Sequence, residues 1–534
     1  MIMNFLKDYI LSLNVFTPLV GVFIILIVSI LGQYGKRDGH VYHNRKNILS
    51  ENWALIISIL CSLIPMIITV ILLCNPSLVF SDFDGNIVFK EQSMWLDNIK
   101  ISYSLMADGL SLVFMLLTEA LTIISIIVYW RVRNNYKGSP LLAMIFMLIL
   151  ETCCLGVFVA NDLLLFYIFF EASLIPMLFI IGIWGREERI YASMKLFIYT
   201  VFGSVLFLFA IIYLKSVFGT SEVSELKLVV DQLAPSVQKY LWIVMFIAFA
   251  IKVPMLPFHT WLPDAHVQAP TFGSMMLAGI LIKMGAFAMI KFLIPLFPEI
   301  SSSYSVFVAF ISVVAIIYGS LLALAQKDMK KLIAYSSVAH MGYVTLGVFV
   351  PCGIGYNGAV FQMISHAFIS SALFMCVGFI YERLHTLEIV KIHSLASRMK
   401  FFSIMFMIFT MGSVGLPGTS GFIGEFLTIL SAISRSGYFV YGLLAATGVV
   451  FGAVYMLLLY KKVFMDHRSG VIGDDIDEAV NIETNKLENT LLVIFACAVI
   501  YFGIQPMKII DKIQNVDINE YSNCKVKNES IKVK

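Results

Sequence analysis

Residues 248–285 decide the fold, and from Phe249 onward they read FAIKVPMLPFHTWLPDAHVQAPTFGSMMLAGILIKMG. Lys252 and Lys283 lie in otherwise apolar runs, and four prolines separate them. Proline removes a backbone donor and breaks a helix, and a charge at bilayer depth costs ~2.5–3.5 kcal/mol on insertion scales. A broken helix with buried lysines is therefore costly to keep, and it predicts a functional site at membrane depth.

The composition of the whole chain is that of a polytopic membrane protein. Of its 534 residues, 59% are hydrophobic and 13% are charged, whereas soluble domains are about 25% charged. The net charge of +3 does not indicate nucleic-acid binding. The first apolar run follows no basic region and precedes no small-residue cleavage site, so we expect a spanning helix rather than a signal peptide.

Long apolar runs predict an all-α membrane protein with about 14 transmembrane helices, because a span needs ~20 apolar residues. Strands are not expected, since the runs show no alternation over ten-residue units. The predicted spans are 14–31, 53–74, 108–130, 140–159, 162–184, 196–214, 240–258, 271–293, 305–324, 329–350, 357–380, 401–430, 440–460 and 489–506.

Lys and Arg residues are concentrated in alternate loops, which predicts the orientation of the chain. The N-terminus, the 75–107 loop and the C-terminus are expected on the non-cytoplasmic side. Trp95 and Tyr103 in this loop are aromatics of the kind found at membrane interfaces. The 461–488 loop carries an acidic patch that is expected to face water or a partner, formed by Asp474, Asp475, Asp477 and Glu478.

Two stretches suggest an internal repeat. VPMLPFHTWLPDA (253–265) and VGLPGTSGFIGEF (414–426) both interrupt an apolar helix with Pro and Gly, next to Lys252 in the first and Glu425 in the second. Five spans separate them, so we predict two inverted five-helix repeats, each with a discontinuous helix, as in transporters built from repeats. The single membrane domain (1–534) would comprise 1–139 with three helices, repeats at 140–293 and 305–465, and a last helix with a basic tail at 489–534.

Four ionisable residues within the spans are the first candidates for function: Glu171, Lys252, Lys283 and Glu425. Glu171 is far from both ends of its span, and Lys252 is its expected counter-ion. Loosening such a pair would bring the lysine nearer to releasing its proton. The structural alternatives are a neutral hydrogen-bonded carboxyl at Glu171, an orphan lysine against carbonyls at Lys283, and a helix cap at Glu425.

Two histidines extend this set, because histidine titrates near neutral pH and relays protons. They are His340 and His366, the latter with Gln362 and Ser370 on the same helix face. Taken alone, each histidine is equally compatible with a satisfied core residue. Together with the charged residues they predict a polar line through consecutive helices.

Other polar residues are not expected to form cofactor or metal sites. His259 and His266 do not have a usual zinc spacing, Asp264 is expected to make a loop or helix-end contact, and Lys291 to extend to the interface. The eight cysteines form no CxxC pair. The GxGxxG beginning at Gly353 is a turn between apolar helices, without the strand that dinucleotide binding requires.

Several motifs in order along the chain resemble the antiporter-like proton-pumping subunits of respiratory complex I, over roughly residues 100–465. Beside the opening stretch, they are FFEASLIPMLFIIGIWG (169–185), DMKKLIAYSSVAHMGYV (328–344), QMISHAFISSALF (362–374), YERLHT (381–386) and LPGTSGFIGEF (416–426). The glutamate at 425 and YERLHT favour one branch of this family, since other branches usually carry lysine at that broken helix.

The resemblance implies roles for six residues in proton translocation. Glu171 and Lys252 match the family's coupled pair, Lys283 its central lysine, and Glu425 its terminal carboxylate. His340 and His366 match its connecting histidines. Protons would arrive from the cytoplasmic side through Lys252 and Lys283, cross by the histidines and leave near Glu425.

The resemblance also implies a non-redox subunit of an NADH:quinone oxidoreductase. NADH, FMN, iron–sulfur clusters and quinone would be bound elsewhere in the complex, with no cofactor in this chain. The expected partners are other membrane-arm subunits, notably the antiporter-like L and N chains and the lateral helix of L, in a bacterial inner membrane. A subunit of a multisubunit cation/proton antiporter is the main alternative, and a stand-alone transporter or a structural scaffold is another.

Overall fold

The computed structural model describes residues 9–34, 43–74, 80–81, 87–96, 101–466 and 483–513. The acidic patch at Asp474, Asp475, Asp477 and Glu478, the tail after residue 513 and the side chain of Trp95 lie outside the described part. Helices make up most of what is described, so the predicted α-helical membrane fold is confirmed.

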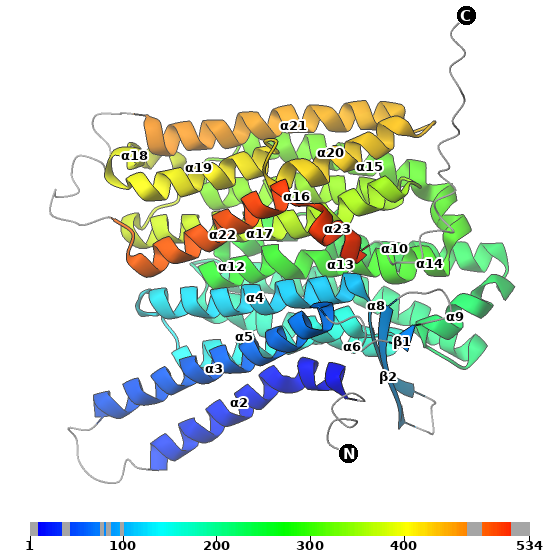
Figure 1. Cartoon of the computed structure of the whole chain (residues 1–534), viewed down its shortest axis with the longest axis horizontal. Helices are drawn as coiled ribbons and strands as arrows, with labels where there is room; N and C mark the ends of the chain where they lie inside the picture. Colours follow the sequence, from blue (N-terminus) through cyan, green and yellow to red (C-terminus); the bar gives the residue numbers. More distant parts are fainter. Residues whose placement is uncertain are drawn as a thin grey trace, which may run out of the picture.

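Long helices, two of which consist of consecutive shorter segments, lie side by side across the molecule (Figure 1). They are α2 (Ile10–Tyr34), α3 (His43–Cys74), α4 (Gly109–Val132), α5 (Pro140–Val159), α6 and α7 (Leu163–Ala172, Leu174–Trp184), α8 (Arg189–Phe218), α12, α13 and α14 (Thr271–Met276, Ile282–Ala288, Ile294–Leu296), α15 (Pro298–Leu324), α16 (Met329–Phe349), α17 (Gly353–Leu384), α21 (Phe439–Tyr460) and α22 (Lys486–Ile504). The shorter ones are α9 (Val223–Val229), α10 (Pro235–Lys252), α11 (Trp261–Gln268), α18 (Leu395–Arg398), α19 (Lys400–Val414), α20 (Ser420–Ser434) and α23 (Met507–Ile513).

Twelve segments of the described chain are long and apolar enough to cross a membrane. They correspond to twelve of the predicted spans. The two other predictions, 240–258 and 401–430, are the ones that contain the proposed breaks, and both segments are helical with an interruption. The total of 14 crossings therefore remains a prediction.

Both interruptions occur where Pro and Gly were expected to end a helix. The first helix, α10, stops at Lys252, and the chain resumes as α11. The second, α19, stops at Val414, and α20 follows after Gly415 and Gly418, which have φ angles of 78° and 92°. Only glycine adopts such angles without strain, so the second break is fixed by these two residues.

A β-hairpin corrects the expectation that the chain has no strands. β2 (Ile87–Leu96) pairs antiparallel with β3 (Ile101–Ala107), and the short β1 (Phe80–Ser81) pairs with β2. The hairpin lies at one end of the bundle, where strands need not be closed into a barrel (Figure 1). Glu91 on β2 accepts hydrogen bonds from Ser12, which fastens the hairpin to α2.

The same backbone arrangement occurs twice, 166 positions apart, at the start of α6 and at the start of α16. In each copy an aspartate caps the helix, Asp162 in the first and Asp328 in the second. The first copy forms backbone hydrogen bonds with the segment before α9, and the second forms them with the segment before α18. These two short helices lie at opposite ends of the bundle (Figure 1). This recurrence supports the predicted inverted repeats at 140–293 and 305–465, whose boundaries stay a prediction.

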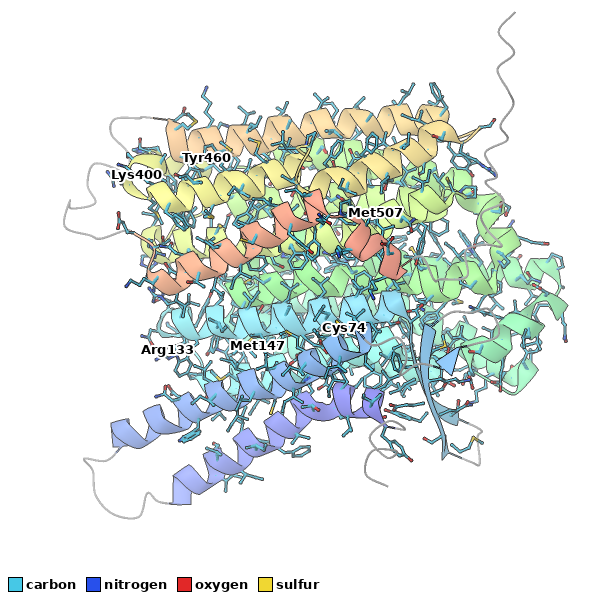
Figure 2. The ribbon with its side chains drawn as sticks, viewed as in Figure 1. Cys74, Arg133, Met147, Lys400, Tyr460 and Met507 are labelled. Atoms are coloured by element: carbon cyan, nitrogen blue, oxygen red, sulfur yellow. The ribbon has the colours of Figure 1, made fainter. Side chains whose placement is uncertain are left out.

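The centre of the bundle is the part most enclosed by protein. The apolar windows of α16 and α17 are 94% buried, whereas those of α2 and α3 are 33% buried. Arg133, Lys400 and Tyr460 lie at one end of the bundle (Figure 2), so basic segments far apart in sequence share that end. Polar side chains on α16 and α17 must therefore find their partners inside the protein.

Candidate functional site

Four of the six predicted residues form a nearly continuous line across the centre of the bundle. Lys283 lies on α13, His366 on α17, His340 on α16 and Glu425 on α20. All four side chains are buried. The sequence placed them on four separate apolar runs, and the fold brings those runs into contact.

Lys283 starts the line and is fully buried, with 0% exposure. Its helix is interrupted on both sides by π-helical turns, η5 (Leu277–Leu281) and η6 (Met289–Leu293). The Lys283 ammonium donates to the carbonyl of Ala278 within the first turn. Its Nζ also lies 2.7 Å from Nδ1 of His366. Such turns are frequent at functional sites, and here one supplies a carbonyl to a buried lysine.

The rings of His340 and His366 lie close together and line the same cavity. Their centroids are 5.5 Å apart, with the rings inclined by 55°. The cavity leaves about 10 Å³ for the centre of a water molecule and is also lined by Gln362, Ser365 and Ser413. Space of about this size is needed to hold one water, which also requires two to four polar partners, so this polar cavity is suited to about one water molecule beside the rings.

Glu425 ends the line in a set of hydrogen bonds. Its Oε1 lies 2.9 Å from Nδ1 of His340 and accepts from Nε2 of Gln362 at 3.3 Å. The other ring nitrogen of His340 lies 3.2 Å from the hydroxyl of Ser413. A second cavity, which leaves about 10 Å³ for the centre of a water molecule, borders Glu425 on the side of Tyr455. Glu425 is therefore bonded to other helices and does not cap α20.

Lys252 and Glu171 are not in contact as an ion pair. None of the described ion pairs joins them within 4.0 Å. Lys252 is 2% exposed, its Nζ has no hydrogen-bond partner, and the ammonium lies 4.6 Å from the ring centroid of Phe170. One carboxylate oxygen of Glu171 is also without a hydrogen bond. The predicted pair is thus present as two neighbouring but separated groups.

The remaining polar residues behave mostly as local contacts. Asp264 is bonded to Lys195 at 2.6 Å, as expected for a helix-end contact. Lys291 does not extend to the interface but pairs with Asp108, the cap of α4. Ser370 donates to the carbonyl of His366, so it supports the helix rather than extending the line.

Histidines and cysteines of the described residues form no group that could hold a metal ion. His266 is stacked on Phe374 at 4.4 Å, and both of its ring nitrogens lack hydrogen bonds. His259 packs edge-on against Tyr318. Five of the seven cysteines described are buried, and all seven are free.

The sequence reasoning missed two fully buried glutamates, Glu119 on α4 and Glu151 on α5. Thr69 donates to the first at 2.8 Å and Ser62 to the second at 2.6 Å. The signal was available, because both lie in long apolar runs and meet the same criterion that selected Glu171. The sequence reasoning also gave Gln362 no place in the line, although the amide nitrogen of Gln362 contacts both His340 and Glu425.

A family model described as NADH:quinone oxidoreductase/Mrp antiporter matches residues 160–456. NADH-quinone oxidoreductase subunit M of Rickettsia conorii is 44% identical over 94% of this chain and 96% of its own length. The subunit M of Rhodobacter capsulatus is 43% identical over 86% of this chain and 88% of its own. NADH-ubiquinone oxidoreductase chain 4 of Chondrus crispus is 38% identical over 95% of this chain and 97% of its own length.

Solved structures give a consistent comparison. A chain of respiratory complex I from Thermus thermophilus with bound NADH superposes with a TM-score of 0.79 at 26% identity, covering 96% of this chain and 99% of that one. A chain of an archaeal membrane-bound sulfane sulfur reductase superposes with a TM-score of 0.78 at 22% identity, covering 94% of this chain and 77% of that one. The second likeness concerns the fold alone.

Proposed function

Since the chain belongs to the NADH:quinone oxidoreductase/Mrp antiporter family, we propose that the line from Lys283 to Glu425 is its proton route. The chain is a proton-translocating membrane-arm subunit of complex I, homologous to subunit M and chain 4. The observation that carries the proposed route is the contact of Lys283 with His366 at one end and of His340 with Glu425 at the other.

Each contact of the line is suited to passing a proton. A charged Lys283 donates to Nδ1 of His366, and the second nitrogen of the same ring can then give up a proton. Water in the intervening cavity would carry the proton to His340. The carboxylate of Glu425 then accepts it and releases it on the side of the second cavity. Histidine suits both intermediate positions because its ring carries two nitrogens, one of which can accept a proton while the other donates one.

Lys252 and Glu171 are proposed to gate this line rather than to lie within it. In the described structure no contact joins Lys252 to Lys283, and the Lys252 ammonium lacks a hydrogen bond. An ammonium without a carboxylate contact at bilayer depth is poorly stabilised, so this arrangement favours proton release. Closing the pair with Glu171 would retain the proton on Lys252. Quinone reduction elsewhere in the complex would drive the change between the two arrangements.

The setting of this activity is also part of the proposal. Glu171 is partly exposed on the bundle surface, which supports coverage by a neighbouring subunit, for which the antiporter-like L and N chains and the lateral helix of L are candidates. We place the chain in a bacterial plasma membrane, with its N-terminus non-cytoplasmic, and assign flavin, iron–sulfur clusters and quinone to other subunits. No contact in the described chain specifically favours the alternative of a multisubunit antiporter.

The test uses the assembled complex in membrane vesicles. Lys252→Ala and Glu171→Ala should each lower proton pumping by about tenfold or more, since proton-transfer groups contribute 10²–10⁴-fold. Lys239→Ala is the matched control, because this exposed lysine lies on the same helix, α10. Complex content is measured in parallel. Normal NADH oxidation and pumping in both variants would refute the proposed gate.

A further inference from the structure

Tyr455 is a buried tyrosine that the proposed proton route does not use, although it borders the cavity beside Glu425. It lies on α21 and is 1% exposed. The cavity leaves about 10 Å³ for the centre of a water molecule, which is about the space that one water needs. His340 and Glu425 line the same cavity. A tyrosine, a histidine and a glutamate from three different helices therefore border one water-sized space.

The hydroxyl end of Tyr455, and not only its ring, lies at this cavity. Gly448 and Gly452 of α21 line the cavity together with Tyr455. A Cβ atom at Gly452 would lie 3.8 Å from the hydroxyl oxygen of Tyr455. Apart from the chain neighbours of Gly452 and the adjoining backbone of α21, it would meet no other described atom within 4 Å. The space beside Gly452 is therefore open, and the Tyr455 hydroxyl is at its edge.

Other hydroxyl groups that line this cavity already have partners. Tyr343 and Ser320 each donate to a backbone carbonyl, at 2.9 and 2.7 Å. The hydroxyl of Ser413 lies 3.2 Å from Nε2 of His340. These groups shape the cavity, but their hydrogen-bonding protons or their neighbouring ring hold them in place.

Tyr455 differs, because its hydroxyl can serve a water molecule as well as the protein. Ser336 is within its reach, and the proton of Ser336 is itself donated to the carbonyl of Ile333 at 2.8 Å. A hydroxyl group can donate one hydrogen bond and accept two. Tyr455 can thus donate to Ser336 and still accept a hydrogen bond from a water in the cavity.

From this geometry we infer that Tyr455 is a positioning residue of the proposed route, which holds the water that exchanges a proton with Glu425. By accepting a hydrogen bond from this water, Tyr455 turns a lone pair of the water toward the carboxylic acid. When Glu425 releases its proton, its O–H bond breaks and an O–H bond forms on the water. The products are a carboxylate and a hydronium ion, which hands its excess proton onward, while Tyr455 keeps its own proton. The inference rests on the proposed role of Glu425.

The competing explanation is that Tyr455 only fills the core. Phenylalanine has the same ring and would keep a packing role, whereas the ability to hold a water is lost with the hydroxyl. Tyr460 offers a matched control on the same helix, α21. It donates its hydroxyl to the carbonyl of Ser403 at 3.3 Å and lines neither of the two cavities.

The experiment compares Tyr455→Phe and Gly452→Ala with Tyr460→Phe, in membrane vesicles that contain the assembled complex. Complex content, proton pumping with NADH and the pH profile of pumping are measured. In Tyr455→Phe we expect pumping per complex to fall by about tenfold, since misplacement of reacting groups by 1 Å can cost up to about a hundredfold. Gly452→Ala keeps the hydroxyl, but its methyl group takes the space of the water, so pumping should fall as well. Tyr460→Phe should keep the wild-type values.

The pH profile separates positioning from packing. Glu425 is faced by the titratable His340 and Tyr343 of α16 and Tyr455 of α21, and by the neutral Gln362 of α17 and Ser413 of α19. Cys497 and Tyr501 of α22 are exposed instead. Without the Tyr455 hydroxyl, the carboxylate loses the water that donates to it. The pH of half-maximal pumping should then rise by about one unit, the size expected for one hydrogen bond to a charged group, whereas lost packing would lower pumping alike at every pH.

Wild-type pumping in Tyr455→Phe would overturn the inference, as would reduced pumping with an unmoved pH profile or equal losses in Tyr455→Phe and Tyr460→Phe. If Tyr455→Phe does not assemble, Gly452→Ala decides, and wild-type pumping there would overturn it. A failure of the proposed route is distinguishable, because Glu425→Gln would then pump normally. A failure of this inference alone leaves Glu425→Gln impaired and Tyr455→Phe normal.

Discussion

Substitution of Gly424 by alanine adds one methyl group next to Glu425 and so tests the last contact of the proposed proton route. Gly424 lies on α20, one residue before Glu425, and packs directly against Gln362 of α17. A Cβ atom at this position would lie 2.3 Å from Oε1 of Gln362 and 2.7 Å from its Cα and Cβ. The Cα belongs to the helix backbone, so rotation of the Gln362 side chain cannot relieve the overlap. Gly424→Ala must therefore separate the two helices.

The required separation is large enough to break a hydrogen bond of the route. Ordinary contact begins at 3.4 Å, so α20 has to move from α17 by about 0.7 Å in a closely packed interior. Such a movement would lengthen the bond from Gln362 Nε2 to Glu425 Oε1, now 3.3 Å, to about 4.0 Å, which is no longer a hydrogen bond. Overpacking of this kind costs about 1–3 kcal/mol.

Because misplacement of reacting groups by 1 Å can cost up to about a hundredfold in rate, we expect Gly424→Ala to lower proton pumping by about tenfold. The complex should still assemble. Pumping is measured by dye quenching in vesicles with NADH as the substrate, and complex content by blotting. Gly182→Ala on α7 is the control, because its Cβ would meet only Ser193 Oγ, at 3.7 Å. Equal pumping in the two variants would refute the reasoning.

Two further substitutions test single charges. Lys291→Met leaves the Asp108 carboxylate buried and unpaired, which should destabilise the subunit by about 3–5 kcal/mol and lower the melting temperature of the complex, with recovery in the double variant that adds Asp108→Asn. Burial raises the pKa of Asp108, but the charge and hydrogen bond of Lys291 together with the hydrogen bonds from Ser111 outweigh it, so the net pKa is lowered. The stability from this pair is present above the unfolded pKa of about 3.9 and is lost as pH falls through the lower folded value. Glu425→Gln removes the carboxylate that lies 2.9 Å from Nδ1 of His340. Because proton-transfer groups contribute 10²–10⁴-fold, proton pumping should fall by about a hundredfold or more, and wild-type pumping in this variant would contradict its place in the route.

The sequence was sufficient for the fold class. It also selected the four residues that the fold brings together, because each is an ionisable group in an apolar run of about the length of a membrane span, whereas their role in proton transfer stays a prediction. It did not predict the β-hairpin, since the rule against strands holds only within the hydrocarbon layer and the hairpin lies at the end of the bundle. It did not predict the π-helical turn at Leu277–Leu281 either. That turn has no sequence pattern of its own, yet it frees the carbonyl that Lys283 uses.

The separation of Lys252 from Glu171 shows what residue types alone cannot determine. Opposite charges on neighbouring spans predict an ion pair, but contact depends on side-chain reach and on the path of the break after α10. Here the break turns the chain away at the residue after Lys252, and the ammonium faces Phe170 instead. A pair that is held apart can be closed by a small movement of a partner, which is the property that a gate requires.

The two breaks differ in a way that would give the proposed route a direction. Lys252 is the last residue of α10, where the negative end of the helix dipole stabilises a cation, but no hydrogen bond holds its Nζ. Glu425 lies in the second turn of α20, beyond the reach of the terminal dipole, and is held by His340 and Gln362 instead. A weakly held cation at one break and a firmly held carboxylate at the other are not interchangeable. A proton released at the first break is therefore favoured to end on the acceptor at the second, and reversal requires those bonds to be broken first.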